Sequence, residues 1–136
     1  MPNSPLTIEN ILGSDGLLAR SLDGFEFRDS QMQMALLIQE ALQKKAPAIV
    51  EAGTGTGKTF GYLVPLILSG KKAVVSTGTK NLQEQIFLKD IPLLRKATNL
   101  DIDAMIMKGR KNYLCLHRYY QFFSQSSFLK TGNGLQ

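Results

Sequence analysis

The sequence predicts an α/β fold in which the strands of a parallel sheet alternate with helices. Short apolar runs at residues 48–50 and 73–77 have the length and composition of buried strands. Between them, a glycine-rich turn leads into a stretch with helical patterning, residues 58–68, which Ser-Gly-Lys-Lys closes. This strand–helix–strand order is typical of a parallel sheet flanked by helices.

Size and composition favour one globular domain. The chain has 136 residues, of which 43% are hydrophobic and 20% charged. Its longest apolar runs, residues 35–38 and 63–68, fall far short of the roughly 20 residues that span a bilayer, so we expect no membrane contact. Residues 1–16 lack the features of a secretory signal, which predicts a cytoplasmic protein. A single cysteine, Cys115, excludes an internal disulfide.

The N-terminal third predicts helices. Residues 1–24 form a lead-in with one short helix. A longer helix begins near Ser30, which has capping-box spacing with Gln33, and ends near residues 44–45. Its apolar face is predicted from residues at helical spacing: Met34, Leu37, Ile38, Ala41 and Leu42.

The second half continues the alternation. A helix follows the second strand as far as Leu88, and Pro92 lies in the connection or starts a new helix. Residues 103–107 predict a third strand. An aromatic-rich stretch, residues 113–123, predicts a helix, and residues 130–136 have loop composition.

Residues 51–59 read EAGTGTGKT at the point where the first strand gives way to a helix, which is the setting of a phosphate-binding loop. Its glycines permit positive φ angles, so that successive N–H groups face phosphate oxygens. Lys58 supplies charge to the β and γ phosphates, and the Thr59 hydroxyl suits Mg²⁺. The predicted ATP·Mg²⁺ site comprises Ala52, Gly53, Thr54, Gly55, Thr56, Gly57, Lys58 and Thr59. Ala52 departs from the strict motif, which begins with glycine, and a simple connecting turn is the alternative.

The segments that flank this loop resemble the DinG/XPD-type superfamily 2 iron–sulfur DNA helicases, and within them the bacterial DinG and YoaA branch. Upstream, FRDSQMQM is similar to the family's R-x-x-Q-x-x-M segment. The resemblance implies that Gln31 binds the adenine edge, with Arg28 nearby. Without the resemblance, both are exposed polar residues on an amphipathic helix.

Downstream, VVSTGTKNLQEQI is similar to the family's second block, a strand that ends in Ser-Thr-Gly-Thr before a helix. Hydroxyl and N–H groups at a helix start suit nucleic-acid phosphates. The resemblance implies contacts to single-stranded DNA from Thr77, Thr79, Lys80 and Gln83. Read alone, Thr79 is an ordinary helix N-cap.

A third block, KGRKNYLCLHR, resembles the family's approach to its iron–sulfur insertion. The resemblance implies that Lys108 and Arg110 contact DNA and that Cys115 is one ligand of a 4Fe–4S cluster. The other three cysteines are absent from the chain, and a lone cysteine is usually a small apolar residue.

Charge is distributed unevenly, since residues 1–70 carry 5 basic and 7 acidic side chains while residues 71–136 carry 11 basic and 4 acidic. The excess of basic side chains in residues 71–136 favours a polyanionic partner, and a solvated basic face is the alternative. The resemblance implies single-stranded DNA.

Taken together, the resemblance implies a P-loop NTPase of the RecA-like type with an incomplete first motor domain: residues 25–112 belong to that domain and residues 113–136 begin the insertion. No apolar strand ends in the acidic pair that hydrolysis requires. We therefore expect the N-terminal piece of a longer 5′ to 3′ helicase, with weak nucleotide binding, no unwinding and little hydrolysis. The alternatives are a non-catalytic nucleotide-binding switch module and a small P-loop kinase.

Overall fold

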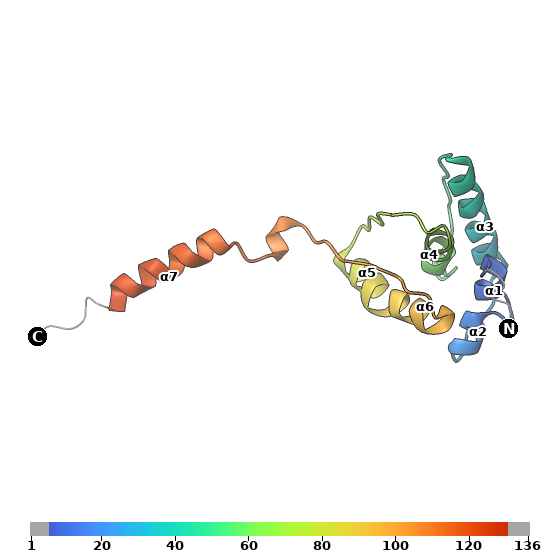
Figure 1. The fold of residues 1–136 in the computed structure, drawn as a ribbon, viewed down its shortest axis with the longest axis horizontal. Helices are drawn as coiled ribbons and strands as arrows, with labels where there is room; N and C mark the ends of the chain where they lie inside the picture. Colours follow the sequence, from blue (N-terminus) through green and yellow to red (C-terminus); the bar gives the residue numbers. More distant parts are fainter. Residues whose placement is uncertain (1–5, 131–136) are drawn as a thin grey trace, which may run out of the picture. The chain divides into compact units, whose positions relative to one another are not determined.

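The computed structural model describes residues 6–130, with side chains described as far as residue 124. They form two compact units that meet at residues 106 and 107, and each is described by itself. The helical elements in these residues are α1 (Ile8–Leu12), α2 (Leu17–Ser21), α3 (Asp29–Lys44), α4 (Lys58–Leu68), α5 (Lys80–Gln85), η1 (Ile86–Asp90), α6 (Ile91–Thr98), η2 (Arg110–Asn112) and α7 (Leu116–Lys130) (Figure 1).

The lead-in contains two short helices, so the prediction of one helix was wrong. A reciprocal capping box starts α1: the Asn10 amide donates to Thr7 Oγ1 (3.2 Å), and the Thr7 amide donates to Asn10 Oδ1 (3.0 Å). Gly13 and Gly16 lie in the tight connection, where a Cβ on either would approach backbone atoms closer than 3 Å. The turn lets both helices place apolar side chains in the same core.

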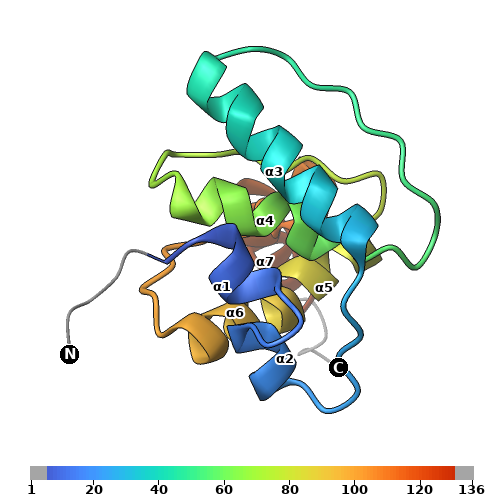
Figure 2. The same cartoon turned by 90° about the vertical axis from the view of Figure 1, so that its right-hand side faces the viewer.

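Helix α3 packs along α4 in the first unit (Figures 1 and 2). Its bounds confirm the predicted helix, but its start does not use Ser30; instead Gln33 Nε2 donates to Asp29 Oδ2 at 2.5 Å. The predicted apolar face was wrong at Leu37, which is 45% exposed, because α3 turns Gln31 and Ala35 towards α4. Gly61 of α4 permits this approach, since a Cβ there would lie 3.1 Å from Met34 Sδ.

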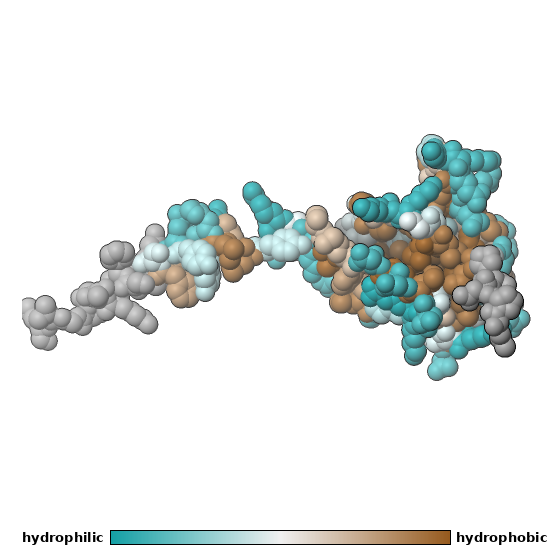
Figure 3. Space-filling model, viewed as in Figure 1, coloured by the Kyte–Doolittle hydropathy of each residue, from teal (hydrophilic) through white to brown (hydrophobic). Residues whose placement is uncertain are grey.

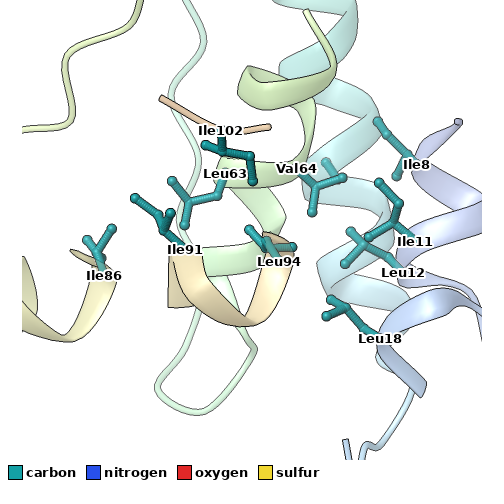
Figure 4. Packing of buried hydrophobic residues seen from close by; sticks show 11 residues of the cluster. Ile8, Ile11, Leu12, Leu18, Leu63, Val64, Ile86, Ile91, Leu94 and Ile102 are labelled. Atoms are coloured by element: carbon teal, nitrogen blue, oxygen red, sulfur yellow. The ribbon is translucent and has the colours of Figure 1, made fainter. Parts of the chain in front are cut away.

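The hydrophobic core of the first unit is built around α4. In Figure 4, Leu63 and Val64 of α4 lie between side chains of α6 and those of the two N-terminal helices. These helices contribute Ile8, Ile11, Leu12, Leu18, Ile91 and Leu94 to the core, and the segment after α6 contributes Ile102. Arg95 Nε donates to the Ile102 carbonyl at 3.0 Å, which holds the chain after α6 against this core.

The parallel sheet predicted from the sequence is not confirmed. None of the residues 6–130 is in a β-strand, and residues 48–50, 73–77 and 103–107 are non-helical segments without strand partners. Ile49 is 99% exposed and Val74 is 97% exposed, so these two apolar side chains, expected inside the sheet, have almost nothing packed on them. A strand is stabilised by ladder hydrogen bonds and by cover on both faces. Brown, apolar side chains lie open on the face of the first unit in Figure 3.

The helix predicted as far as Leu88 continues without a break, but its register changes. Helix α5 passes into a π-helical turn, η1, in which the Ile91 amide donates to the Ile86 carbonyl. Helix α6 follows with Pro92 in its first turn, which agrees with the predicted new start. Pro92 has no N–H to donate to the carbonyl four residues earlier, so one regular helical hydrogen bond is already missing here. Widening the helix into a π-turn at this point therefore loses no additional hydrogen bond.

The second unit consists of η2 and α7 within the described residues. Helix α7 begins at Leu116, later than predicted, and includes Lys130, which the sequence placed in a loop. The rest of that predicted loop, residues 131–136, lies outside the described range. The rings of Tyr119 and Phe123 contact each other along α7, with centroids 4.7 Å apart and planes tilted by 45°. No helix in residues 6–130 has the length and apolar character needed to cross a membrane.

Candidate functional site

The predicted phosphate-binding loop forms a tight turn directly before α4. Gly55 and Gly57 have φ angles of 80° and 74°, a region that glycine adopts without strain. Thr56 Oγ1 donates to the Gly53 carbonyl at 2.9 Å, which closes the turn. The loop ends at the N-terminus of an 11-residue helix, whose unpaired N–H groups and partial positive charge favour an anion.

Lys58, the first residue of α4, folds back over this loop. Its Nζ donates to the carbonyl oxygens of Ala52 (2.9 Å) and Gly53 (2.5 Å). The ammonium group therefore lies at the mouth of the loop, where it neutralises carbonyl dipoles that would otherwise repel a phosphate. An incoming polyphosphate has to compete with these two carbonyls for the same charge.

Gln31 is not an exposed polar residue, so that alternative from the sequence was wrong. It is 4% exposed, and its Nε2 donates to the Gly57 carbonyl at 2.7 Å. Arg28 is exposed and donates from Nη1 to the Gly55 carbonyl, while its Nη2 pairs with Glu26 at 3.1 Å. The two residues predicted to lie beside the nucleotide thus hold the backbone of the loop that would bind its phosphates.

The contact between Gln31 and the loop makes a testable prediction for Gly57→Ala. A Cβ at Gly57 would lie 2.0 Å from Gln31 Nε2, whereas a Cβ at Gly55 would meet nothing within 4 Å, although both glycines have positive φ. Both variants should lose about 1–2 kcal/mol of stability through backbone strain. Gly57→Ala should lose about 1 kcal/mol more, because Gln31 must give up its hydrogen bond.

Urea unfolding of the two variants measures this difference, with Gly55→Ala as the matched control for strain. Equal losses in both variants would mean that the Gln31 side chain is not held against Gly57 in solution.

Thr59, the expected magnesium ligand, is the first residue after Lys58 in α4, and Tyr62 lies one turn further along the same helix. Burial raises the pKa of Tyr62, the neighbouring Thr59 side chain lowers it, and the charge of Asp90 raises it further. Burial also raises the pKa of Asp90, against the lowering effects of a hydrogen bond from Gln85 and the charge of Lys89. Neither Tyr62 nor Asp90 belongs to a motif found in the sequence.

The residues predicted to contact DNA fall into both units. Thr79 is the N-cap of α5, where its Oγ1 accepts from the Leu82 amide at 3.2 Å, as the sequence indicated. Thr77 Oγ1 donates to the Thr79 carbonyl at 3.0 Å. Lys80 and Gln83 lie in α5, while Lys108 and Arg110 belong to the second unit. Within the first unit, Thr77, Thr79, Lys80 and Gln83 therefore lie together at the start of α5.

Cys115 lies exposed just before α7. It is the single cysteine of the sequence, and residues 6–130 contain no group of three or more His, Cys, Asp or Glu side chains that could hold a metal. The residues of this chain therefore do not fit a 4Fe–4S cluster, which needs four ligands. The loop at residues 52–59, by contrast, has the donors, charge and glycine conformations that a nucleotide phosphate requires.

The loop lies within the part of the chain that matches a known family. The profile of the DEAD/DEAH box helicase family matches residues 30–119. The chain is 47% identical over 118 residues to ATP-dependent DNA helicase YoaA of Haemophilus influenzae, which covers 87% of this chain and 18% of that protein. It is 37% identical over 113 residues to 3'-5' exonuclease DinG of Bacillus subtilis, covering 80% of this chain and 12% of that protein. The chain thus spans less than a fifth of these relatives. No solved structure matches significantly.

Proposed function

Since the chain belongs to the DEAD/DEAH box helicase family, we propose that it is the ATP-binding part of an ATP-dependent DNA helicase. The observation that carries the proposal is the glycine turn at residues 52–59. Lys58 donates hydrogen bonds to two carbonyls of this turn, and Gln31 donates one to the Gly57 carbonyl. ATP with Mg²⁺ is the ligand, because the loop offers backbone N–H groups, a lysine and a threonine hydroxyl in the order that β and γ phosphates and their metal require.

Each residue of the site has a separate task in this proposal. Lys58 releases the loop carbonyls and binds the β and γ phosphates, and Thr59 supplies its hydroxyl to Mg²⁺. Gln31 and Arg28 keep Gly57 and Gly55 in the conformation that exposes their neighbours' N–H groups. A glutamine amide has more than one donor and acceptor, so Gln31 also has the capacity to bind the adenine edge.

The DNA-binding part of the proposal depends on charge. Single-stranded DNA would contact the start of α5 through Thr77, Thr79, Lys80 and Gln83, and the second unit through Lys108 and Arg110. Residues 107–136 contain 5 basic and no acidic side chains, which favours a phosphate backbone. In a longer protein, hydrolysis would drive 5′ to 3′ translocation with a completed RecA-like sheet, and Cys115 would join cluster ligands supplied by other residues.

Titration calorimetry with ATP·Mg²⁺, alone and with single-stranded DNA, tests the proposal. We expect weak binding of ATP·Mg²⁺ that strengthens at least several-fold when DNA is present, without ATP hydrolysis by this chain. Binding that ignores DNA would favour a nucleotide-binding switch module. Phosphoryl transfer to a small acceptor would favour a P-loop kinase, and absence of any nucleotide binding would contradict the proposed site itself.

A further inference from the structure

The exposed aromatic side chains of the described residues are concentrated in the second unit. Within residues 6–106, Phe27 is the one aromatic residue with an exposed side chain. In the second unit, as far as residue 124, five aromatic side chains are between 41% and 68% exposed: Tyr113, Tyr119, Tyr120, Phe122 and Phe123. Exposed apolar groups that gather in one place indicate a binding surface.

Part of this surface is a stripe along α7. Leu116, Tyr119, Tyr120 and Phe123 have the i, i+3, i+4, i+7 spacing of one helix face, and we call them the aromatic stripe. The Tyr119 ring contacts those of Phe123 and Tyr120, with centroids 4.7 and 5.7 Å apart. These contacts leave every side chain of the stripe at least 41% exposed, so a planar group can pack on it. Apolar side chains are visible on α7 in Figure 3.

A basic turn directly precedes α7. The Lys108 amide donates to the Tyr113 hydroxyl at 2.8 Å, and the Tyr113 amide donates to the Arg110 carbonyl at 3.2 Å. These two bonds close the chain around η2, whose first two residues, Arg110 and Lys111, are exposed. The turn therefore presents two cationic side chains just before the aromatic stripe begins.

Charge decides which partner fits this combination. Residues 107–136 carry 5 basic and no acidic side chains, which favours a polyanion. A protein partner would use the apolar stripe and leave the basic turn without a role. Single-stranded DNA uses both, because its phosphates pair with cationic groups and its unpaired bases stack on aromatic rings. Duplex DNA keeps its bases inside and offers only the phosphates.

We propose that the aromatic stripe of α7 is a base-stacking surface for single-stranded DNA, with Arg110 and Lys111 holding the adjoining phosphates. Stacking tolerates any sequence, because every base has a π-face. The inference rests on the DNA-binding part of the proposed function and adds to its phosphate contacts a surface that binds the bases. It does not depend on the nucleotide site at residues 52–59.

The first test compares two strands of roughly 15 nucleotides, an oligo-dT and an abasic strand with the same number of phosphates. The full chain should bind the oligo-dT at least about tenfold more tightly, and only the oligo-dT should quench its tyrosine emission. This emission reports on the second unit, because the chain has four tyrosines and no tryptophan, and three of the tyrosines lie at positions 113, 119 and 120.

The outcomes of this comparison separate the stacking surface from the proposed function. Equal affinities for the two strands would mean that phosphates alone are bound, which overturns the stacking surface and leaves the proposed function standing. Absence of binding to both strands would contradict the surface and the DNA-binding part of the proposed function together. Base-dependent DNA binding without any ATP·Mg²⁺ binding would contradict the nucleotide site and support the surface.

The second test removes rings or charge. The double variant Tyr119→Leu with Phe123→Leu keeps apolar, helix-forming side chains and should weaken oligo-dT binding by about tenfold or more. The slope of log affinity against log salt should not change, because no phosphate contact is lost. Arg110→Gln should instead reduce that slope by about 0.7. Phe27→Leu, which removes an exposed ring of the first unit, is the matched control and should change neither quantity.

Far-UV circular dichroism shows whether the double variant keeps its helices. Natural affinity for oligo-dT in a variant that keeps them would mean that the stripe does not contact bases and would overturn the inference. If the helices are lost, the comparison of the oligo-dT with the abasic strand, which needs no variant, decides.

Discussion

Lys58→Ala is expected to weaken ATP·Mg²⁺ binding by about 10- to 100-fold, which corresponds to the loss of one or two charge-assisted hydrogen bonds at about 1.5–3 kcal/mol. The physical reason is that Lys58 Nζ already lies at the mouth of the loop, within 3 Å of the Ala52 and Gly53 carbonyls. Without the ammonium group, those carbonyl dipoles would face the phosphates directly. Titration calorimetry at fixed ionic strength measures the change.

Lys72→Ala is the control for this experiment. Lys72 is an exposed lysine on the extended segment after α4, so its removal changes the net charge by the same amount at a distance from the loop. Comparable losses in the two variants would show that binding depends on the general positive field of the chain. The assignment of residues 52–59 as the site would then be wrong.

Leu94→Ala is expected to reduce the free energy of unfolding by about 2–5 kcal/mol, since it deletes a large side chain that is 1% exposed. Ile49→Ala is expected to change it by less than about 0.5 kcal/mol, although Ile49 belongs to the most strand-like run of the sequence. The reason is that Ile49 is 99% exposed and loses no contacts. Leu94, by contrast, packs against α4 and the N-terminal helices (Figure 4).

Chemical unfolding of the two variants, side by side, decides between the two architectures. A loss of about 2 kcal/mol or more for Ile49→Ala would mean that residues 48–50 are covered in solution and that the predicted sheet forms. A small loss would mean that the core around α4 holds the first unit together without a sheet.

Local signals predicted the bounds of α3 and α4 well. The bounds of α4 follow from the glycine turn before Lys58 and the Ser-Gly pair after Leu68, both of which are visible in the sequence. The loop was predictable for the same reason, because a phosphate-binding turn is a motif of consecutive residues. The sheet was not, since β-pairing depends on which segments become neighbours, and no residue type in the runs 48–50 or 73–77 specifies a partner.

The contacts behind the loop were beyond prediction because they join residues far apart in the sequence. Gln31 and Gly57 are 26 positions apart, and helical periodicity alone placed Gln31 on the exposed face. Asp90 is buried at the end of a π-turn, which shifts the register of one helix by a residue. The pattern of apolar residues in the sequence does not reveal such a shift. The one local sign of it is the proline two positions after Asp90.

The loop at residues 52–59 joins two segments of opposite dynamic character. Before it, residues 48–51 have backbone groups without regular partners, so their amides should exchange with solvent at nearly intrinsic rates. After it, α4 runs through the centre of the core and should exchange most slowly. A nucleotide bound at this boundary would need to order only the N-terminal side, because the other wall of its site is already rigid. The entropic cost of binding would therefore fall almost wholly on the approach to the loop.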